Sequence, residues 1–244
     1  MTRMLLAAMA LTLSVSVAAV AQTTKPWTEW SEKEAAKILN DSPWGQTQTE
    51  KREAPPNANE AISRNGSGLK GGMASTNGES GQAVPDTVVR FRARFLSARP
   101  VRSAFARILV LRRPTTDESL VTELQGFIDR DFADYVVVTL MVEAASDGLS
   151  APAMQVLKSA STDTFKEKVF LERKDGKRLT LADYRPPGPD GMGAKFIFTR
   201  KLDGQPFLTE ASDNVKFQAE LTEKMKLNLK YKVSEMMYDG KLEY

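Results

Sequence analysis

The fold of this chain is decided by residues 165–181, which read FKEKVFLERKDGKRLTL. Two short runs containing alternating apolar residues flank Asp175-Gly176, and Asp-Gly between such runs is a strong signal for a tight β-hairpin. We therefore expect strands over residues 165–173 and 178–181. The pairing must be antiparallel, because only antiparallel strands can be joined by so short a turn.

The same pattern continues toward the end of the chain. Residues 195–201 and 205–208 flank a second Asp-Gly pair, and residues 215–221 and 225–233 follow as two further strand patterns. The region after residue 160 is therefore predicted to form a mainly antiparallel sheet.

Upstream of the hairpins, helix and strand patterns are mixed. Val88–Phe95 alternates apolar residues with arginines, and residues 135–142 form a β-branched apolar run typical of a central strand. Helical patterns occupy residues 100–111, 118–130 and 152–158. Because the helical patterns come first and the hairpin patterns follow them, we expect a single α+β domain over residues 86–244, with two or three helices inserted early.

A tryptophan-rich segment precedes this domain at residues 22–45. It holds all three tryptophans of the chain, Trp27, Trp30 and Trp44. Ser31 and Glu34 form a capping box, so a helix is expected over Glu32–Asn40. A helix this short is unstable alone in water, so its apolar stripe and the tryptophans must bury against something. Two interpretations remain: a clasp docked on the main domain, or a surface for a partner or saccharide.

Residues 46–85 are predicted to be a disordered linker that tethers the short helix. Of these 40 residues, 17 are Gly, Ser, Asn or Pro, and only four are large and apolar. Such a segment cannot bury enough surface to offset the entropy of ordering it.

The first residues have the pattern of a secretory signal peptide. Arg3 precedes an apolar run at residues 4–20, and Ala19-Val20-Ala21 resembles a small-residue cleavage site. We expect cleavage after Ala21 and a periplasmic or secreted product; an uncleaved membrane anchor is the rival interpretation. No later stretch is apolar enough to span a bilayer, so no transmembrane segment is expected after cleavage.

The composition excludes several kinds of chemistry. The sequence contains no cysteine and no histidine, so disulfides, thiolate zinc sites, cysteine nucleophiles and Ser-His-Asp triads are all absent. We predict no metal and no cofactor. With 34 basic and 31 acidic residues, the chain has no bulk charge that would favour nucleic acid as a partner.

One pattern resembles a known group of proteins. It reads Trp-x-x-Trp-Ser-x-Lys-Glu-Ala-x-Lys-Ile-Leu-Asn-Asp-Ser-Pro-Trp at residues 27–44, with Phe-Leu-Ser-Ala-Arg-Pro-Val-Arg-Ser-Ala at residues 95–104. Together these resemble an uncharacterised family of exported bacterial proteins. The resemblance covers about a fifth of the chain. It implies export and a shared architecture, but no activity and no ligand.

The charges fall into two adjoining blocks. Residues 88–113 contain eight arginines and no acid, whereas residues 117–147 contain eight acids and one base. The two blocks can neutralise each other within the fold. If the arginines instead face outward, anionic envelope polymers or lipid headgroups become plausible partners. An envelope protein is the other partner expected. The candidate binding residues are therefore the tryptophans named above together with Arg90, Arg92 and Arg94.

Two motif matches involve other polar residues. Asp129, Asp131 and Asp134 could supply oxygen ligands to calcium, but the spacing lacks the glycine and glutamate of an EF-hand, and a solvated helix end is favoured. Ser67-x-x-Lys70 with Ser212-Asp213-Asn214 matches two motifs of penicillin-binding acyl transferases. Because Ser67 lies in the linker, we interpret that match as coincidence.

The sequence favours a non-catalytic binding or scaffolding module of the cell envelope. The alternative is a carboxylate-dependent hydrolase of extracellular polymers, since glycoside hydrolysis needs two acids and neither histidine nor cysteine. No catalytic pair of acids can be chosen from the 31 that the chain contains.

Overall fold

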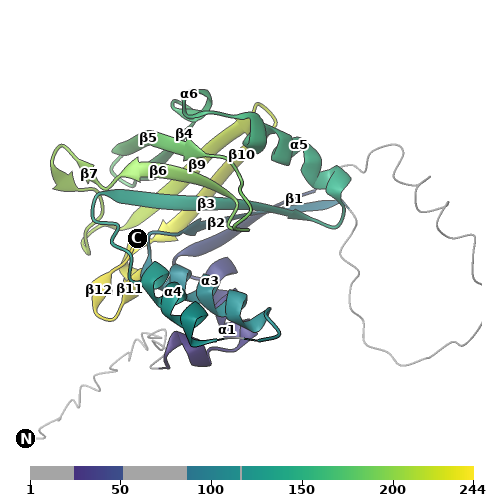
Figure 1. The fold of residues 1–244 in the computed structure, drawn as a ribbon. Helices are drawn as coiled ribbons and strands as arrows, with labels where there is room; N and C mark the ends of the chain where they lie inside the picture. The colour runs from purple at the N-terminus through teal and green to yellow at the C-terminus, as the bar shows by residue number, and fades with distance from the viewer. Residues whose placement is uncertain (1–24, 52–86, 116) are drawn as a thin grey trace, which may run out of the picture.

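The computed structural model describes residues 25–51, 87–115 and 117–244. They form an α+β fold on an eight-stranded antiparallel sheet, which confirms the predicted fold class (Figure 1). In sheet order the strands are β1 (Gly45–Lys51), β2 (Val88–Phe95), β3 (Tyr135–Ala144), β6 (Ala194–Thr199), β5 (Arg178–Arg185), β4 (Val169–Arg173), β9 (Asn214–Thr222) and β10 (Met225–Lys232).

Helices and small hairpins connect these strands. The helices are α1 (Glu32–Asn40), α3 (Arg99–Leu111), α4 (Glu118–Ile128), α5 (Asp147–Ser159) and α6 (Thr162–Phe165), with single 3₁₀ turns η1 (Trp27–Glu29) and η2 (Val233–Glu235). The small hairpins pair β7 (Lys201–Leu202) with β8 (Gln205–Pro206) and β11 (Met237–Tyr238) with β12 (Lys241–Leu242). Within the described chain, no helix is both long enough and apolar enough to cross a bilayer.

The sheet curls until its two edge strands meet. The side-chain amide of Gln48 on β1 donates to the Lys226 carbonyl on β10 (2.9 Å) and accepts from the Asn228 N–H (3.0 Å). The hydroxyl of Tyr231, also on β10, donates to the Ala93 carbonyl on β2 (3.0 Å). The Gln48 side chain therefore joins β1 to β10, whereas backbone hydrogen bonds join the other neighbouring strands. The sheet thus approaches a closed barrel (Figure 1).

The inside of the curl is packed with aromatic rings. Phe165, Tyr184, Phe196 and Phe217 contact one another in turn, with ring centroids 5.0–5.6 Å apart. The three phenylalanines are fully buried. Burying such a ring contributes roughly 1.5–3 kcal/mol, so this cluster is a main source of the stability that the chain needs in the absence of disulfides.

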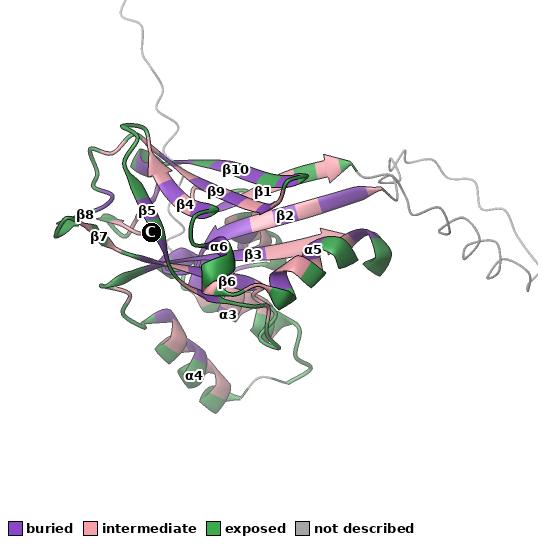
Figure 2. Cartoon of the chain, turned by 90° about the horizontal axis from the view of Figure 1, so that it is seen from above, coloured by how far each residue is buried: buried purple, intermediate pink, exposed green. Residues whose placement is uncertain are grey.

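Helix α5 covers the concave side. It packs against β2, β3 and β9, strands from both halves of the sheet (Figure 2). Its buried residues, Leu149, Ala153 and Leu157, repeat every four positions and so form one stripe. This stripe explains why α5 begins five residues before the predicted start at residue 152, with Pro152 inside the helix instead of at its beginning.

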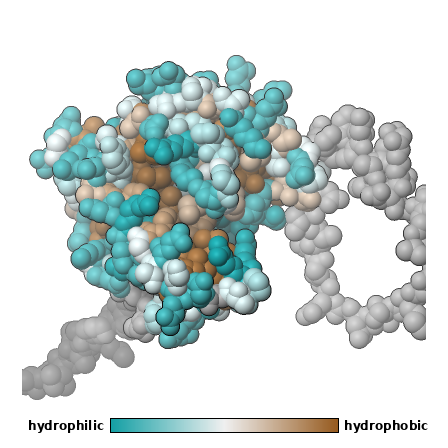
Figure 3. Space-filling model, in the orientation of Figure 1, coloured by the Kyte–Doolittle hydropathy of each residue, from teal (hydrophilic) through white to brown (hydrophobic). Residues whose placement is uncertain are grey.

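Helices α1, α3 and α4 lie together on the other side, where α1 packs against β1 and β2, α3 against α1, and α4 against α3 (Figure 1). The capping box predicted for α1 is confirmed: Ser31 Oγ accepts from the Glu34 N–H (3.2 Å), and the Glu34 carboxylate accepts from the Ser31 N–H (2.7 Å). Helix α3 ends in an area where apolar side chains reach the surface. The most exposed large apolar residues of the described chain are Leu109, Leu111 and Tyr135. Figure 3 shows hydrophobic residues gathered in patches among hydrophilic ones on this face of the molecule.

The tryptophan segment and the main domain share one core. Trp30, Ala35, Leu39 and Trp44 belong to the same buried cluster as the residues of the sheet. The segment 25–51 therefore folds as part of the sheet domain.

The predicted start of the linker at residue 46 is wrong, because residues 46–51 belong to β1 and pair with β2. This strand reads GQTQTEK and has no large apolar residue, so its sequence carries no hydrophobic alternation. Pairing with β2 stabilises it instead. The rest of the predicted linker and the predicted signal peptide lie outside the described residues.

Two further boundaries differ from the prediction. The strand expected from residue 165 begins at Val169, because Ser161 caps the short helix α6 that ends at Phe165. Strand β6 begins at Ala194, directly after Gly193, which has φ +88°. A Cβ atom at Gly193 would lie 2.2 Å from the Leu140 carbonyl oxygen, so only glycine allows this close approach to β3.

Candidate functional site

The three tryptophans pack against their own chain. Trp30 is fully buried and donates its indole N–H to the Lys25 carbonyl (3.1 Å). Trp44 is 7% exposed and donates to the Glu243 carbonyl (2.8 Å), and the half-buried Trp27 donates to Gln125 Oε1 (2.8 Å). The clasp interpretation therefore describes this segment, and its indole N–H groups are used within the protein.

Arg94 is enclosed in the fold and not on a binding surface. It is 1% exposed, with Nε donating to the Leu39 carbonyl (2.8 Å) and Nη2 to Asn40 Oδ1 (2.8 Å), both at the end of α1. Its guanidinium also lies over the Phe105 ring, 5.3 Å from the centroid. Burial lowers the pKa of Arg94 to about 10, so it remains a cation at neutral pH. Its role is to fix α1 to the sheet, because the last carbonyls of a helix have no partner within the helix.

The other two arginines of β2 face the same side of the sheet. Arg92 pairs with Glu143 (2.8 Å), and Arg90 lies opposite Glu143 in the β2–β3 register. An Arg99–Asp129 pair (2.7 Å) also joins the basic block to the acidic one. Two ion pairs thus join the basic block to the acidic block, and their side chains are partly exposed.

A pocket of about 390 Å³ lies where the two blocks meet. We call it the arginine pocket. It is bordered by the first turn of α3, by the connection between α4 and β3, and by two residues from far along the chain. Its charged lining residues are Arg99, Arg102, Asp129, Arg130, Asp131, Arg200 and Glu243.

Arg102 is the most buried charge of this pocket, at 5% exposed. Its Nε donates to the Ile128 carbonyl (2.9 Å), while Nη1 donates to the carbonyls of Leu96 (3.2 Å) and Ser97. Its remaining nitrogen, Nη2, makes no hydrogen bond with the described residues. The buried arginine nitrogens that lack a partner there are Arg92 Nε and Arg94 Nη1. Arg102 therefore combines a fixed position with an unused donor in a residue that lines the pocket.

The electrostatic surroundings of Arg102 are mixed. Burial lowers the pKa of Arg102 to about 10; the carboxylates of Glu243 and Asp129 oppose this, while Arg99 and Arg200 add to it. Arg102 remains protonated at neutral pH and has two further cations near it. Such a cluster of guanidinium groups favours an anion, which relieves their mutual repulsion.

Phe132 contacts both Arg102 and Arg200. Arg102 lies over the Phe132 ring, 4.8 Å from its centroid, and Arg200 Nη1 donates to the Phe132 carbonyl (3.3 Å). The same nitrogen donates to the Tyr244 carbonyl (2.7 Å), and the guanidinium lies 3.9 Å from the Tyr244 ring centroid. Both guanidinium groups are thus held by backbone carbonyls and rings, leaving other N–H groups for a ligand.

The aspartates considered as calcium ligands are already engaged. Asp129 accepts from Arg99 and from Gln125 Nε2 (2.7 Å), and Asp131 accepts from the Ala133 N–H (2.8 Å). Asp134 does not line the pocket. In the part of the chain that the structure describes, no three carboxylates gather closely enough to hold a metal ion.

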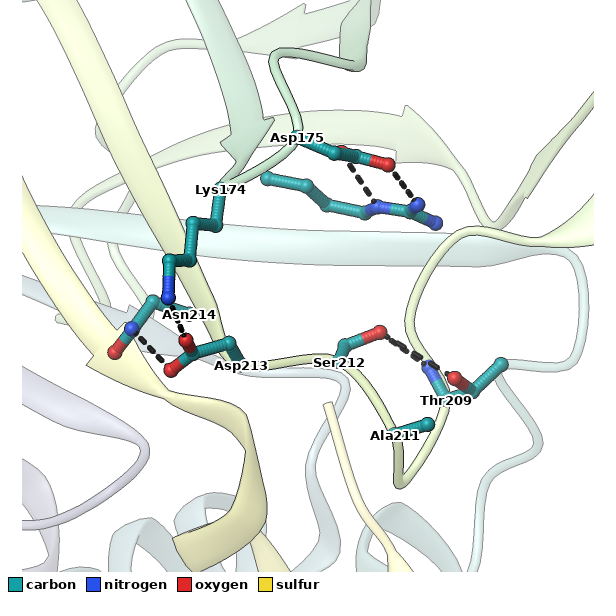
Figure 4. Close-up of a pocket in the computed structure, with 8 residues that line it drawn as sticks. Lys174, Asp175, Thr209, Ala211, Ser212, Asp213 and Asn214 are labelled. Atoms are coloured by element: carbon teal, nitrogen blue, oxygen red, sulfur yellow. Dashed lines mark hydrogen bonds and ion pairs between the residues drawn. The ribbon is translucent and has the colours of Figure 1, made fainter.

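A second hollow of about 490 Å³ lies between the β4–β5 turn and the loop before β9 (Figure 4). Ser212 Oγ accepts from the Thr209 N–H (3.0 Å), and Asp213 pairs with Lys174. The hydrogen bond from Lys174 lowers the pKa of Asp213, and the same bond raises the pKa of Lys174. A protonated lysine cannot serve as a base for Ser212, so this hollow lacks the arrangement that acyl transfer needs. Ser67 and Lys70 lie outside the described residues.

Sequence reasoning found only part of the arginine pocket. Arg99 and Arg102 belong to the basic block and to the motif at residues 95–104, which was the one available signal. Arg200 and Glu243 belong to no motif, and nothing in the sequence indicates that they lie beside α3.

Comparisons with known proteins add little. No protein-family model and no curated protein matches the sequence. Among solved structures, the chain is similar to a novel protein of unknown function from Burkholderia pseudomallei K96243. The match has 10% sequence identity and a TM-score of 0.38, and covers 57% of this chain and 72% of that chain. Likeness at this level carries no functional conclusion.

Proposed function

We propose that this is an exported, non-catalytic binding protein of the cell envelope, which holds an anionic group of an envelope polymer in the arginine pocket. The observation that carries the proposal is the state of Arg102. The side chain of Arg102 is only 5% exposed, and three backbone carbonyls accept hydrogen bonds from it. Its Nη2 makes no hydrogen bond with the described residues. Desolvating a guanidinium is costly, and an anion bound at its free edge offsets that cost.

The surroundings of the carboxyl groups support binding over hydrolysis. Every described carboxyl group whose pKa departs from its ordinary value has it lowered: these are Glu34, Asp175, Asp190 and Asp213. A glycoside hydrolase needs the opposite, an acid whose pKa is raised so that it can donate a proton near neutral pH.

Export is part of the proposal and rests on the signal-peptide pattern at residues 1–21. A protein in that compartment meets anionic polymers of the envelope. The arginine pocket offers the chemistry to recognise them, because guanidinium groups match carboxylate and phosphate oxygens with paired N–H donors.

Calorimetric titration of the purified protein with phosphate, sulfate and acetate tests this function. We expect Arg200→Gln to weaken anion binding by about tenfold or more, because it removes a charged donor. The matched control is Arg185→Gln, which removes an exposed arginine outside the pocket that pairs with Asp183 (3.4 Å). No binding by the unchanged protein, or equal losses in the two variants, would overturn the proposal. Thermal melting of each variant shows whether Arg200→Gln still folds.

A further inference from the structure

The arginine pocket is lined by charges of both signs. Four arginines and three carboxylates border it, which leaves a single net positive charge. One pair is satisfied within the protein, because Arg99 pairs with Asp129 (2.7 Å). A purely anionic group would be attracted by Arg102 and Arg200 and repelled by the carboxylates of the same pocket. The lining therefore suits a ligand that carries charges of both signs.

Glu243 supplies one carboxylate in a fixed position. Its N–H donates to the Met236 carbonyl (2.9 Å), and its carbonyl accepts from the Trp44 indole (2.8 Å). Its side chain reaches the start of α3, where Oε2 accepts from the Arg99 N–H (2.9 Å). The other oxygen, Oε1, makes no hydrogen bond with the described residues. Glu243 thus brings an unused acceptor to the lining of the pocket.

The pocket offers a second acceptor and two donors in the same way. Asp131 is exposed; its Oδ1 accepts from the Ala133 N–H (2.8 Å), and Oδ2 makes no hydrogen bond within the described chain. Arg102 Nη2 is also unpaired and is not among the unpartnered atoms sealed from solvent, so a ligand can reach it. Arg200 uses only Nη1 in its hydrogen bonds with the described residues.

We infer that the arginine pocket binds a group that carries an amine close to its anion, as an amino acid or an aminoalkyl phosphate does. This inference rests on the proposed function and names the class of group bound. Arg102 and Arg200 hold the anion through paired N–H donors. The ammonium has three N–H donors, which match the unused oxygens of Glu243 and Asp131.

The size and the apolar part of the lining fit such a group. The volume of about 390 Å³ is larger than a single small ion needs. The half-buried ring of Phe132 lies among the charged residues and offers a surface to the methylene groups that separate the amine from the anion.

Two pairs of probes test the inference by calorimetric titration near neutral pH: β-alanine with propionate, and phosphoethanolamine with ethyl phosphate. The members of each pair share their anion and their carbon chain and differ only in the amine. We expect the amine to tighten binding by about tenfold in each pair. Whichever amine-bearing probe binds more tightly identifies the anion as a carboxylate or a phosphate.

Glu243→Gln should move the two members of a pair in opposite directions. The glutamine oxygen can still accept from the Arg99 N–H, but the charge is lost. Binding of β-alanine should therefore weaken by about tenfold, whereas binding of propionate should strengthen by about threefold because a repelling charge is removed. Asp131→Asn should act in the same direction and less strongly, since Asp131 is exposed. The matched control is Glu235→Gln, which removes an exposed glutamate outside the pocket that pairs with Lys232 (2.7 Å).

The outcomes separate the two proposals. Arg200-dependent binding of all probes with no gain from the amine would overturn the inference and leave the proposed function intact. Absence of binding by every probe would overturn both. A gain from the amine that survives in both Glu243→Gln and Asp131→Asn would also contradict the inference. If thermal melting shows that Glu243→Gln does not fold, the probe pairs on the unchanged protein and on Asp131→Asn decide.

Discussion

Arg94 and Arg102 are two buried arginines of the same basic block, but the residues that surround their guanidinium groups differ. Both donate to carbonyls at the ends of helices, Arg94 at the end of α1 and Arg102 at the end of α4. Burial lowers the pKa of each to about 10. Arg94 is enclosed beneath α1, whereas Arg102 lines a pocket. Burial alone therefore does not identify a binding arginine. The residues that cover the guanidinium decide whether it can reach a ligand.

The cause of the difference is the position of each residue in the sheet and helices. Arg94 lies in β2 near its end, where α1 contacts the strand and Phe105 of α3 covers the guanidinium. Arg102 lies in the first turn of α3, at the boundary of the helical layer. There the pocket beside it is lined by the end of α4, the α4–β3 connection, Arg200 and Glu243.

The largest expected effect is that of Arg94→Ala. It should lower the free energy of unfolding by about 3 kcal/mol, because two hydrogen bonds from a charged donor are lost and the Leu39 carbonyl is left unpaired. Anion affinity should not change. Chemical denaturation measures the loss, with Arg90→Ala on the same strand as control. An equal loss in both variants would show that Arg94 does not anchor α1.

Lysine substitutions at the two positions sharpen the comparison. Arg102→Lys and Arg94→Lys should each cost about 2 kcal/mol, since one ammonium group cannot reproduce the fork of a guanidinium. Only Arg102→Lys should also weaken phosphate binding, by about tenfold. Denaturation and calorimetry on the same samples separate the two effects. If Arg94→Lys weakened binding equally, the distinction between the two arginines would fail.

Tyr231→Phe tests the seam of the sheet beside Arg94. It should cost about 1.5 kcal/mol at neutral pH, because the Ala93 carbonyl loses its donor. Burial raises the pKa of Tyr231 far above 10, as it also raises that of Tyr184. Above pH 10 an unfolded tyrosine loses its proton while these two do not, so stability falls as pH rises through that range.

The variant should therefore lose stability less steeply than the unchanged protein when the pH rises above 10. Denaturation midpoints between pH 8 and pH 11 check this, with phenolate absorbance reporting ionisation. A parallel fall in both proteins would contradict the assignment to Tyr231.

The smallest effect is expected from Ser31→Ala. Loss of the capping box at α1 should cost about 1 kcal/mol. It weakens the helix that holds Arg94 and does not touch the residues around Arg102, so anion affinity should stay within about twofold. Thermal melting compared with Ser234→Ala, at an exposed serine of η2, measures the difference. A change in anion affinity would instead reveal coupling between the two regions.

Local signals predicted much of the fold. The capping box placed α1 at its observed bounds, and the Asp-Gly pair at residues 175–176 placed the β4–β5 turn, where Gly176 has φ +82°. These features depend on a few neighbouring residues, which is why periodicity and turn chemistry reveal them. Strand β1 was not predicted, because its sequence is polar and its stability comes from pairing with β2.

The sequence by itself determined the fold class, the start of α1 and the lack of disulfide, thiolate and imidazole chemistry. The tertiary structure alone decided which arginines anchor helices and which line a pocket. The physical reason is distance along the chain: Arg102 meets Arg200 and Glu243 only because the curled sheet and the terminal hairpin bring them together. Residues of one type in one charged block look alike in sequence, and what packs over each of them assigns its role.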